Sequence, residues 1–134
     1  MKVIIKDKMK VTDIVADGII MIGEQDKTLI PRLFFLRDKS LNNNFNKNQL
    51  IEISIENITK EDMGEDIVNK SIILYAVVNV VCSGGIWTKY YDEDKGAFHK
   101  TFFYDGKGLI TLPTLRKGNP FEIGDFVKME IKNV

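Results

Sequence analysis

The stretch Leu50-Ile51-Glu52-Ile53-Ser54-Ile55-Glu56 decides the fold class, because apolar and polar side chains alternate along it. Successive side chains of a β-strand point to opposite faces of a sheet, so the isoleucines would share one face and the polar residues the other. The C-terminal region repeats the pattern, with Val127, Met129 and Ile131 alternating with Lys128, Glu130 and Lys132. Each stretch predicts an antiparallel strand with one buried and one solvated face.

Further strands are expected on both sides of these two. Residues 11–15 and 19–22 flank Ala16-Asp17-Gly18, and an Asp-Gly pair is a strong signal of a β-hairpin. Residues 28–37 form another strand candidate, which Pro31 places at a sheet edge or a bulge because proline cannot donate to a ladder. Residues 71–82 are almost wholly apolar, which indicates burial on both faces or a bend through the core. The remaining strand candidates are residues 86–91, 97–104, 109–112 and 121–134.

One helix candidate interrupts the strands. Thr59-Lys60-Glu61-Asp62 fits a capping box, and Met63, Ile67 and Val68 would form a short apolar stripe, so a short helix or turn is expected. Residues 38–48 hold five asparagines and predict a loop. About nine or ten strands against one short helix predict an all-β fold, a small barrel or a sandwich of antiparallel strands. We expect one β-rich domain over residues 1–134 and no internal repeat.

The overall composition excludes several classes of protein. Nineteen basic and nineteen acidic side chains among 134 residues give zero net charge, which disfavours binding by bulk positive charge. The longest apolar run, residues 72–78, is far shorter than the roughly twenty residues of a membrane span. No signal peptide is recognised, and the single cysteine cannot form an internal disulfide, so a cytoplasmic location is expected. Frequent isoleucine, lysine and asparagine indicate an AT-rich genome, such as that of a low-GC bacterium or its phage. If the protein is encoded by a phage, the expected location is the cytoplasm of the host.

Signals for catalysis and for metal or cofactor binding are weak. His99 is the only histidine, and neither a Cys-x-x-Cys pair nor a glycine-rich phosphate loop occurs. Cys82 and His99 could form a nucleophile–base pair, although a buried cysteine and a histidine on a strand face are the expected alternative. The acidic residues 92–94 lack the spacing of a calcium loop and predict a solvated hairpin tip. No catalytic residue, metal or cofactor is therefore predicted.

Aromatic residues are concentrated between positions 87 and 104, which hold seven of the thirteen in the chain. If residues 92–96 join two strands in a hairpin, period two places aromatic rings and lysines together on one face. Single-stranded nucleic acid needs that combination, because rings stack on unpaired bases, at about 1–3 kcal/mol per base, and cations meet the phosphates. The candidate binding residues are Trp87, Lys89, Tyr91, Phe98, Lys100, Phe102 and Tyr104 on the strands, and Lys107, Arg116 and Lys117 in the following loops.

Two other arrangements of these aromatic residues remain open. Phe98, Phe102 and Tyr104 could be the core face of their strand, since aromatic residues are good strand formers. A lysine at position 100 is awkward in a core, although its stem can reach past a barrel rim. In a mixed arrangement, some rings are buried while Trp87 or Tyr91 is exposed.

The segment Phe121-Glu122-Ile123-Gly124-Asp125-Phe126-Val127-Lys128-Met129-Glu130-Ile131 resembles the loop and strand of many oligonucleotide-binding (OB) folds, in which Gly-Asp precedes an alternating strand. The short helix candidate and the long strand candidate 71–82 are compatible with that fold. The resemblance implies a small OB-like barrel and a single-stranded DNA-binding protein, of the compact type that phages of low-GC bacteria use in DNA replication. The strand candidates exceed the five of a minimal OB barrel, so additions to it are implied.

The function expected first is non-catalytic, sequence-independent binding of single-stranded DNA on the aromatic and basic surface. Several copies would gain affinity by multivalency, so a homo-oligomer is expected. The second hypothesis is a protein-interaction or structural β-domain, such as a phage virion component or a host-directed inhibitor, in which the aromatic hairpin is the contact surface. An enzyme that uses Cys82 and His99 is the third.

Overall fold

The computed structural model describes residues 4–15, 18–23, 32–36, 45–69, 71–82, 85–89, 99–104 and 118–134, with the backbone alone for 32–36, 82, 85 and 99–104. Within these ranges the elements are β1 Ile4–Val15, β2 Gly18–Gly23, β3 Arg32–Leu36, β4 Leu50–Ile58, η1 Lys60–Asp62, β5 Ile67–Val68, β6 Ile72–Cys82, β7 Gly85–Lys89, β8 His99–Tyr104 and β9 Phe126–Asn133. The strands form one sheet with antiparallel pairing throughout. The predicted all-β fold is confirmed. No helix in the described ranges is long and apolar enough to cross a membrane.

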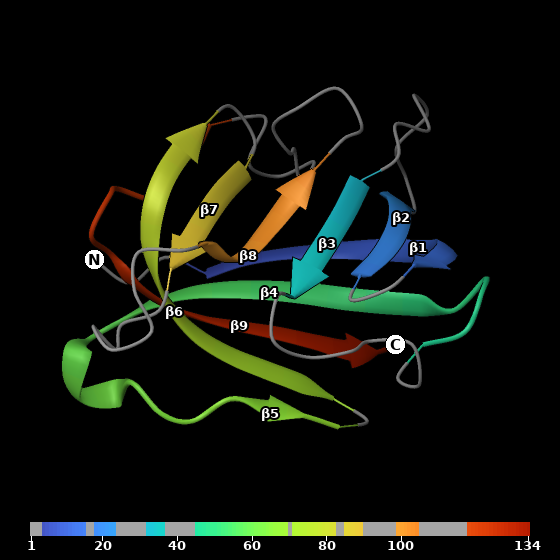
Figure 1. Ribbon diagram of the computed structural model, residues 1–134, viewed down its shortest axis with the longest axis horizontal. Coiled ribbons are helices and arrows are strands. Elements are labelled where there is room, and N and C mark those ends of the chain that lie inside the picture. The colour runs from blue at the N-terminus through green and yellow to red at the C-terminus, as the bar shows by residue number, and fades with distance from the viewer. Residues whose placement is uncertain are drawn as a thin grey trace.

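The sheet is strongly curled, and β6 connects its two ends. The strand order is β5-β6-β7-β8-β3-β2-β1-β4-β9, and β6 pairs with β9 as well. The first half of β6 pairs with β9 and its second half with β7. Figure 1 shows β6 curving from beside β5 up to β7, while β1, β4 and β9 cross the molecule and β7, β8, β3 and β2 stand at a steep angle to them. Among the described strands, only β5 has a single neighbour.

The core lies inside this curl, and the alternating stretches supply much of it. Ile51, Ile53 and Ile55 on β4 are buried, as are Val127, Met129 and Ile131 on β9. They join one cluster with buried residues of β1, β2, β6 and β7. The period-two prediction is therefore confirmed for both strands.

The long apolar strand also follows its prediction, in the form of a bend. Three consecutive residues, Ala76, Val77 and Val78, are buried near the middle of β6. A register shift between Val78 and Val80 marks a bulge in the pairing with β7. A bulge bends a strand and increases its twist. This irregularity lies at the point where β6 passes from one part of the curl to the other.

Two expectations about individual elements hold only in part. The predicted short helix or turn is the 3₁₀ turn η1, with the Thr59 hydroxyl donating to the Asp62 carboxylate at 3.0 Å, but Ile67 and Val68 form β5 rather than a helical stripe. Of the edge or bulge expected from Pro31, the edge is wrong, because β3 pairs with both β2 and β8; nothing described tests the bulge. Pro31 and residues 109–112 lie outside the described ranges.

The structure contains an internal repeat that the sequence analysis did not expect. Strands β4-β1-β2-β3 pair with one another in the same order as β9-β6-β7-β8. The bulge between Val11 and Asp13 of β1 matches the bulge between Val78 and Val80 of β6. In the pairing of β3 with β8, Phe34 lies opposite its equivalent Phe103. Two halves with the same pairing therefore face each other about a pseudo-twofold axis.

The turns before β4 and β9 have equivalent hydrogen bonds, so the repeat extends to these turns. Asn46 N–H donates to the Gln49 side chain at 2.7 Å, and Glu122 N–H donates to the Asp125 carboxylate at 2.9 Å. Asn48 and Gly124 both have positive φ, and their N–H groups donate to Val11 O and Val78 O at 2.8 and 2.9 Å. Buried Phe45 and Phe121 precede the two turns. The Gly-Asp pair that carries the OB resemblance thus fastens β9 to β6.

Candidate nucleic-acid interface

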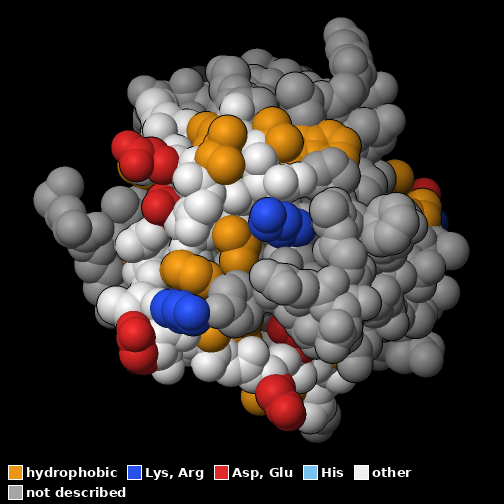
Figure 2. All heavy atoms as spheres, turned by 60° about the vertical axis from the view of Figure 1, so that its left-hand side comes forward, with side chains coloured by type: hydrophobic (Ala, Val, Ile, Leu, Met, Phe, Trp, Pro, Cys, Tyr) orange, Lys and Arg blue, Asp and Glu red, His pale blue; other side chains and the backbone are white. Residues whose placement is uncertain are grey.

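Strands β7 and β8 pair in antiparallel fashion, as the sequence predicts for this hairpin. Ile86 and Thr88 of β7 are fully buried, whereas Trp87 and Lys89 are partly exposed. Alternate residues of a strand face opposite sides, so Trp87 and Lys89 lie on the outer face of the curled sheet. Figure 2 shows that hydrophobic side chains lie close to basic ones on the side of the molecule that comes forward from the left of Figure 1.

The register of β8 continues this outer face in part. Phe102 lies opposite Trp87, and Tyr104 lies opposite Leu33 of the next strand. A register shift then places His99, not Lys100, opposite Lys89. An extra residue on β8 produces this shift. The shared face expected for Phe98, Lys100, Phe102 and Tyr104 stays a prediction, because Phe98 and the side chains of residues 99–104 lie outside what the structure describes.

The other predicted binding residues cannot be placed against this pair. Tyr91, Phe98, Lys107, Arg116 and Lys117 lie outside the described ranges, as does the connection of residues 92–96. Among the predicted residues, the structure describes the side chains of Trp87 and Lys89. These two side chains define the described centre of the candidate interface.

Trp87 is held by the sheet and still presents part of its surface. Its indole Nε1 is buried, while the whole side chain is only partly buried. Across the strand pair it lies opposite Val80 of β6, which is 37% exposed. A ring with one edge fixed in the protein and part of its surface accessible can stack on a planar ligand with little loss of side-chain freedom.

The outer face that carries Trp87 and Lys89 also includes residues from the other half of the sheet, which the sequence did not predict. Ile20 and Ile22 of β2 are partly exposed on the outer face, and β3 lies between β2 and β8. Alternation predicts strands in both regions, but nothing in the sequence indicates the pairing of β3 with β8, which joins residues nearly seventy positions apart. The outer surface is therefore broader than the hairpin and more aliphatic beyond it.

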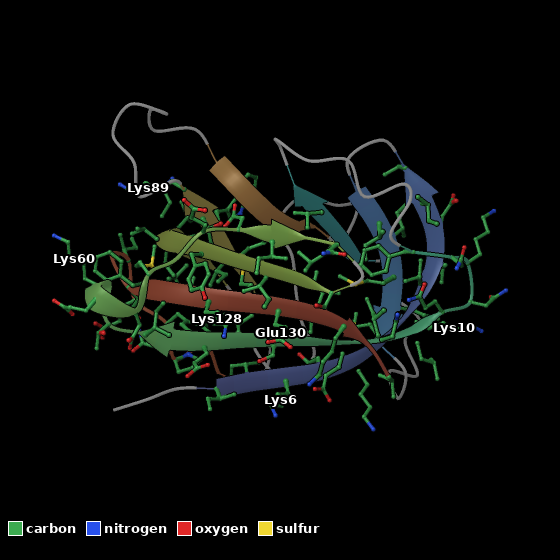
Figure 3. The ribbon with its side chains drawn as sticks, turned by 90° about the horizontal axis from the view of Figure 1, so that it is seen from below. Lys6, Lys10, Lys60, Lys89, Lys128 and Glu130 are labelled. Atoms are coloured by element: carbon green, nitrogen blue, oxygen red, sulfur yellow. The ribbon has the colours of Figure 1, made fainter. Side chains whose placement is uncertain are left out.

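The opposite outer face, on β1, β4 and β9, is charged but balanced. Lys8, Glu52 and Lys132 lie in one row across the three strands, and Lys132 Nζ is 3.7 Å from Glu52 Oε1. Lys6, Ser54 and Glu130 form the next row on this face, and Lys128 lies opposite Glu56 in the row after it. Figure 3 shows Lys89 well apart from Lys6, Lys128 and Glu130. Because glutamates alternate with these lysines, this face offers a polyanion no clear basic track.

The backbone positions of Cys82 and His99 do not support the nucleophile–base pair considered from the sequence. Cys82 pairs with Gly85 at the start of β7, and His99 pairs with Lys89 at its end. Four residues along a strand separate these positions by about 13 Å, too far for a nucleophile–base contact. The described ranges contain no cluster of three or more side chains able to hold a metal ion. One acidic side chain in these ranges has a structural contact: the Asp66 carboxylate accepts a hydrogen bond from the Tyr75 N–H at 3.0 Å.

Comparison with protein-family models, curated proteins and solved structures gives no match for this chain. The OB resemblance therefore stays a prediction, and the functional argument depends on the residues themselves.

Proposed function

We propose that this chain is a non-catalytic protein that binds single-stranded DNA, without sequence preference, on the outer face of β7 and β8. The observation that carries the proposal is the position of Trp87 and Lys89. They lie two residues apart on the outer face of a strand whose inner residues, Ile86 and Thr88, close the core. An aromatic surface for a base and a cation for a phosphate are thereby held on a rigid strand.

The balance of charge in the chain supports a local interface. With no net charge and a balanced face on β1, β4 and β9, a nucleic acid gains little from the protein as a whole. Affinity has to come from base stacking and a few lysines beside the rings. Stacking does not require a particular base, because every base has a π-face, so binding without sequence preference is expected.

The proposal includes several copies of the chain acting together in the cytoplasm, or in the host cytoplasm for a phage protein. One small sheet face covers few nucleotides. A homo-oligomer would place several such faces along one strand and raise the overall affinity without new contacts.

The single tryptophan allows a direct test. Trp87 emission is followed while oligo-dT or a duplex of equal length is added at two salt concentrations. Quenching by oligo-dT, with an affinity that falls as salt rises, is the expected result. Unchanged emission together with no mobility shift at low salt would contradict the proposal.

A protein-interaction domain is the second candidate, and the aliphatic part of the outer face favours it. Ile20 and Ile22 are partly exposed there and offer nothing to a phosphate. Apolar residues on the same sheet face as a tryptophan, here with β8 and β3 between them, are typical of protein contact surfaces. Stable oligomerisation without affinity for DNA, or co-purification of one defined protein, would favour this candidate over the first.

A further inference from the structure

The internal repeat allows equivalent positions in the two halves to be compared. Lys47 at the tip of the turn before β4 reaches Asp13 of β1, with Lys47 Nζ 3.7 Å from Asp13 Oδ1. Both side chains are more than half exposed, at 67% and 52%. In the first half, this part of the surface is therefore a solvated ion pair.

The equivalent positions in the second half hold apolar residues. Ile123 stands where Lys47 stands, and Val80 stands where Asp13 stands, because the same turn hydrogen bonds and the same bulge fix both pairs. Ile123 is 71% exposed and Val80 is 37% exposed. The ion pair in the other half shows that the fold does not require apolar side chains here. We call Val80 and Ile123 the apolar rim.

The apolar rim is continuous with the candidate interface. Val80 lies opposite Trp87, and Phe102 lies opposite Trp87 on the other side. Val80, Trp87 and the Phe102 position thus form one row across the strands. Ile123 belongs to the turn that is hydrogen-bonded to Val78, two residues before Val80. Lys89, two residues from Trp87 on the same strand, belongs to the neighbouring row.

We infer that unpaired bases of a single-stranded nucleic acid pack along this row as far as the apolar rim, while its phosphates follow the neighbouring row at Lys89. This inference rests on the proposed function and specifies how the strand lies on the site. Glu122 is exposed beside Ile123, and the Asp125 carboxylate is held in the same turn by the Glu122 N–H at 2.9 Å. Two carboxylates disfavour phosphates at the rim but not the uncharged faces of bases.

The test separates base contacts from phosphate contacts. Fluorescence anisotropy of labelled 12-mers is measured with oligo-dT and with an abasic strand of equal charge. The variants are Ile123→Ser and Val80→Thr, with Lys47→Ser as the matched control at the equivalent turn position. We expect each rim variant to bind oligo-dT about fivefold more weakly, through loss of buried apolar area. Binding of the abasic strand should stay the same, and the control should match the wild type on both strands.

Each outcome bears on one of the two proposals. Binding of neither strand by the wild type contradicts the proposed function itself. Wild-type binding of oligo-dT with no loss in Ile123→Ser and Val80→Thr overturns only the role of the rim. Equal weakening on the abasic strand overturns the base contact. A change in sedimentation of Ile123→Ser with oligo-dT affinity intact makes the rim a protein contact instead. Thermal unfolding verifies that each variant is folded.

Discussion

Asn48 and Gly124 occupy equivalent turns with positive φ, 69° and 95°, and they allow a matched test of backbone strain. A Cβ at Gly124 would meet nothing within 4 Å, so the cost of Gly124→Ala is conformational and not steric. We expect that variant to lower the free energy of unfolding by about 1–2 kcal/mol. Asn48→Gly should change it by less than about 0.5 kcal/mol, because glycine adopts this conformation freely. Urea unfolding followed by circular dichroism measures both, and equal stability of the two variants would contradict the turn assignment.

Lys89 is the described cation of the candidate interface, and its contribution can be separated from general charge. Replacing it as Lys89→Gln should weaken oligo-dT binding about threefold and reduce the slope of log K against log salt by about 0.7. Lys128→Gln removes the same charge from the balanced face, where Lys128 lies opposite Glu56, and should leave that slope unchanged. Binding of oligo-dT by each variant at four salt concentrations measures the two slopes. The same slope for both variants would mean that binding responds only to total charge.

At the scale of elements, the period-two alternation of apolar and polar residues was sufficient to locate strands that have one solvated face. It located β4, β9 and the β1–β2 hairpin, because local alternation records which residues face the core. It could not place β3 within the sheet: Pro31 predicted an edge or a bulge, and the pairing with β8, which excludes an edge, depends on contacts distant in sequence. The β8 register also escaped prediction, since the shift beside Lys89 has no local signature. For the candidate site, Trp87 and Lys89 were found from alternation, whereas Val80 needed the pairing of β6 with β7.

Strands of the curl and the short edge strand should differ sharply in their contribution to stability. Ile53 of β4 is 1% exposed and lies between β1 and β9, so Ile53→Ala should cost about 2–5 kcal/mol through lost burial and a cavity. Ile67 of β5 is 47% exposed, and β5 pairs only with β6 among the described strands. Ile67→Ala should therefore cost less than about 0.5 kcal/mol. Thermal and urea unfolding compare the two, and a large loss at Ile67 would give β5 a structural weight that its exposure does not suggest.

At the scale of the whole molecule, the repeat shows what a single sequence conceals. Equivalent positions keep apolar character more often than identity. Val11 and Val78, Ile19 and Ile86, and Phe45 and Phe121 are identical. Buried Ile51 and Ile53 correspond to buried Val127 and Met129, whereas Met21 corresponds to buried Thr88. The number of residues that separates two equivalent strands in the sequence also differs from one strand pair to the next, because the connections within the two halves differ in length. A fixed period is therefore absent, and only the shared register and bulges reveal the equivalence.

The pseudo-twofold arrangement leads to a test by circular permutation. Residues 59–71 carry the chain from the end of β4 to the start of β6, and by symmetry the end of β9 lies in the same relation to the start of β1. A flexible linker on the order of ten residues from Val134 to Met1 should therefore span that path without strain. New termini at Glu65, which is exposed and lies between η1 and β5, interrupt no sheet pairing in the described ranges. We expect this permutant to unfold cooperatively, with a β-sheet circular dichroism spectrum like that of the parent. New termini between Ile53 and Ser54 provide the control, because they divide a core strand, and that permutant should not fold. If the first permutant also fails to fold, the two halves are not related in the way that the strand registers indicate.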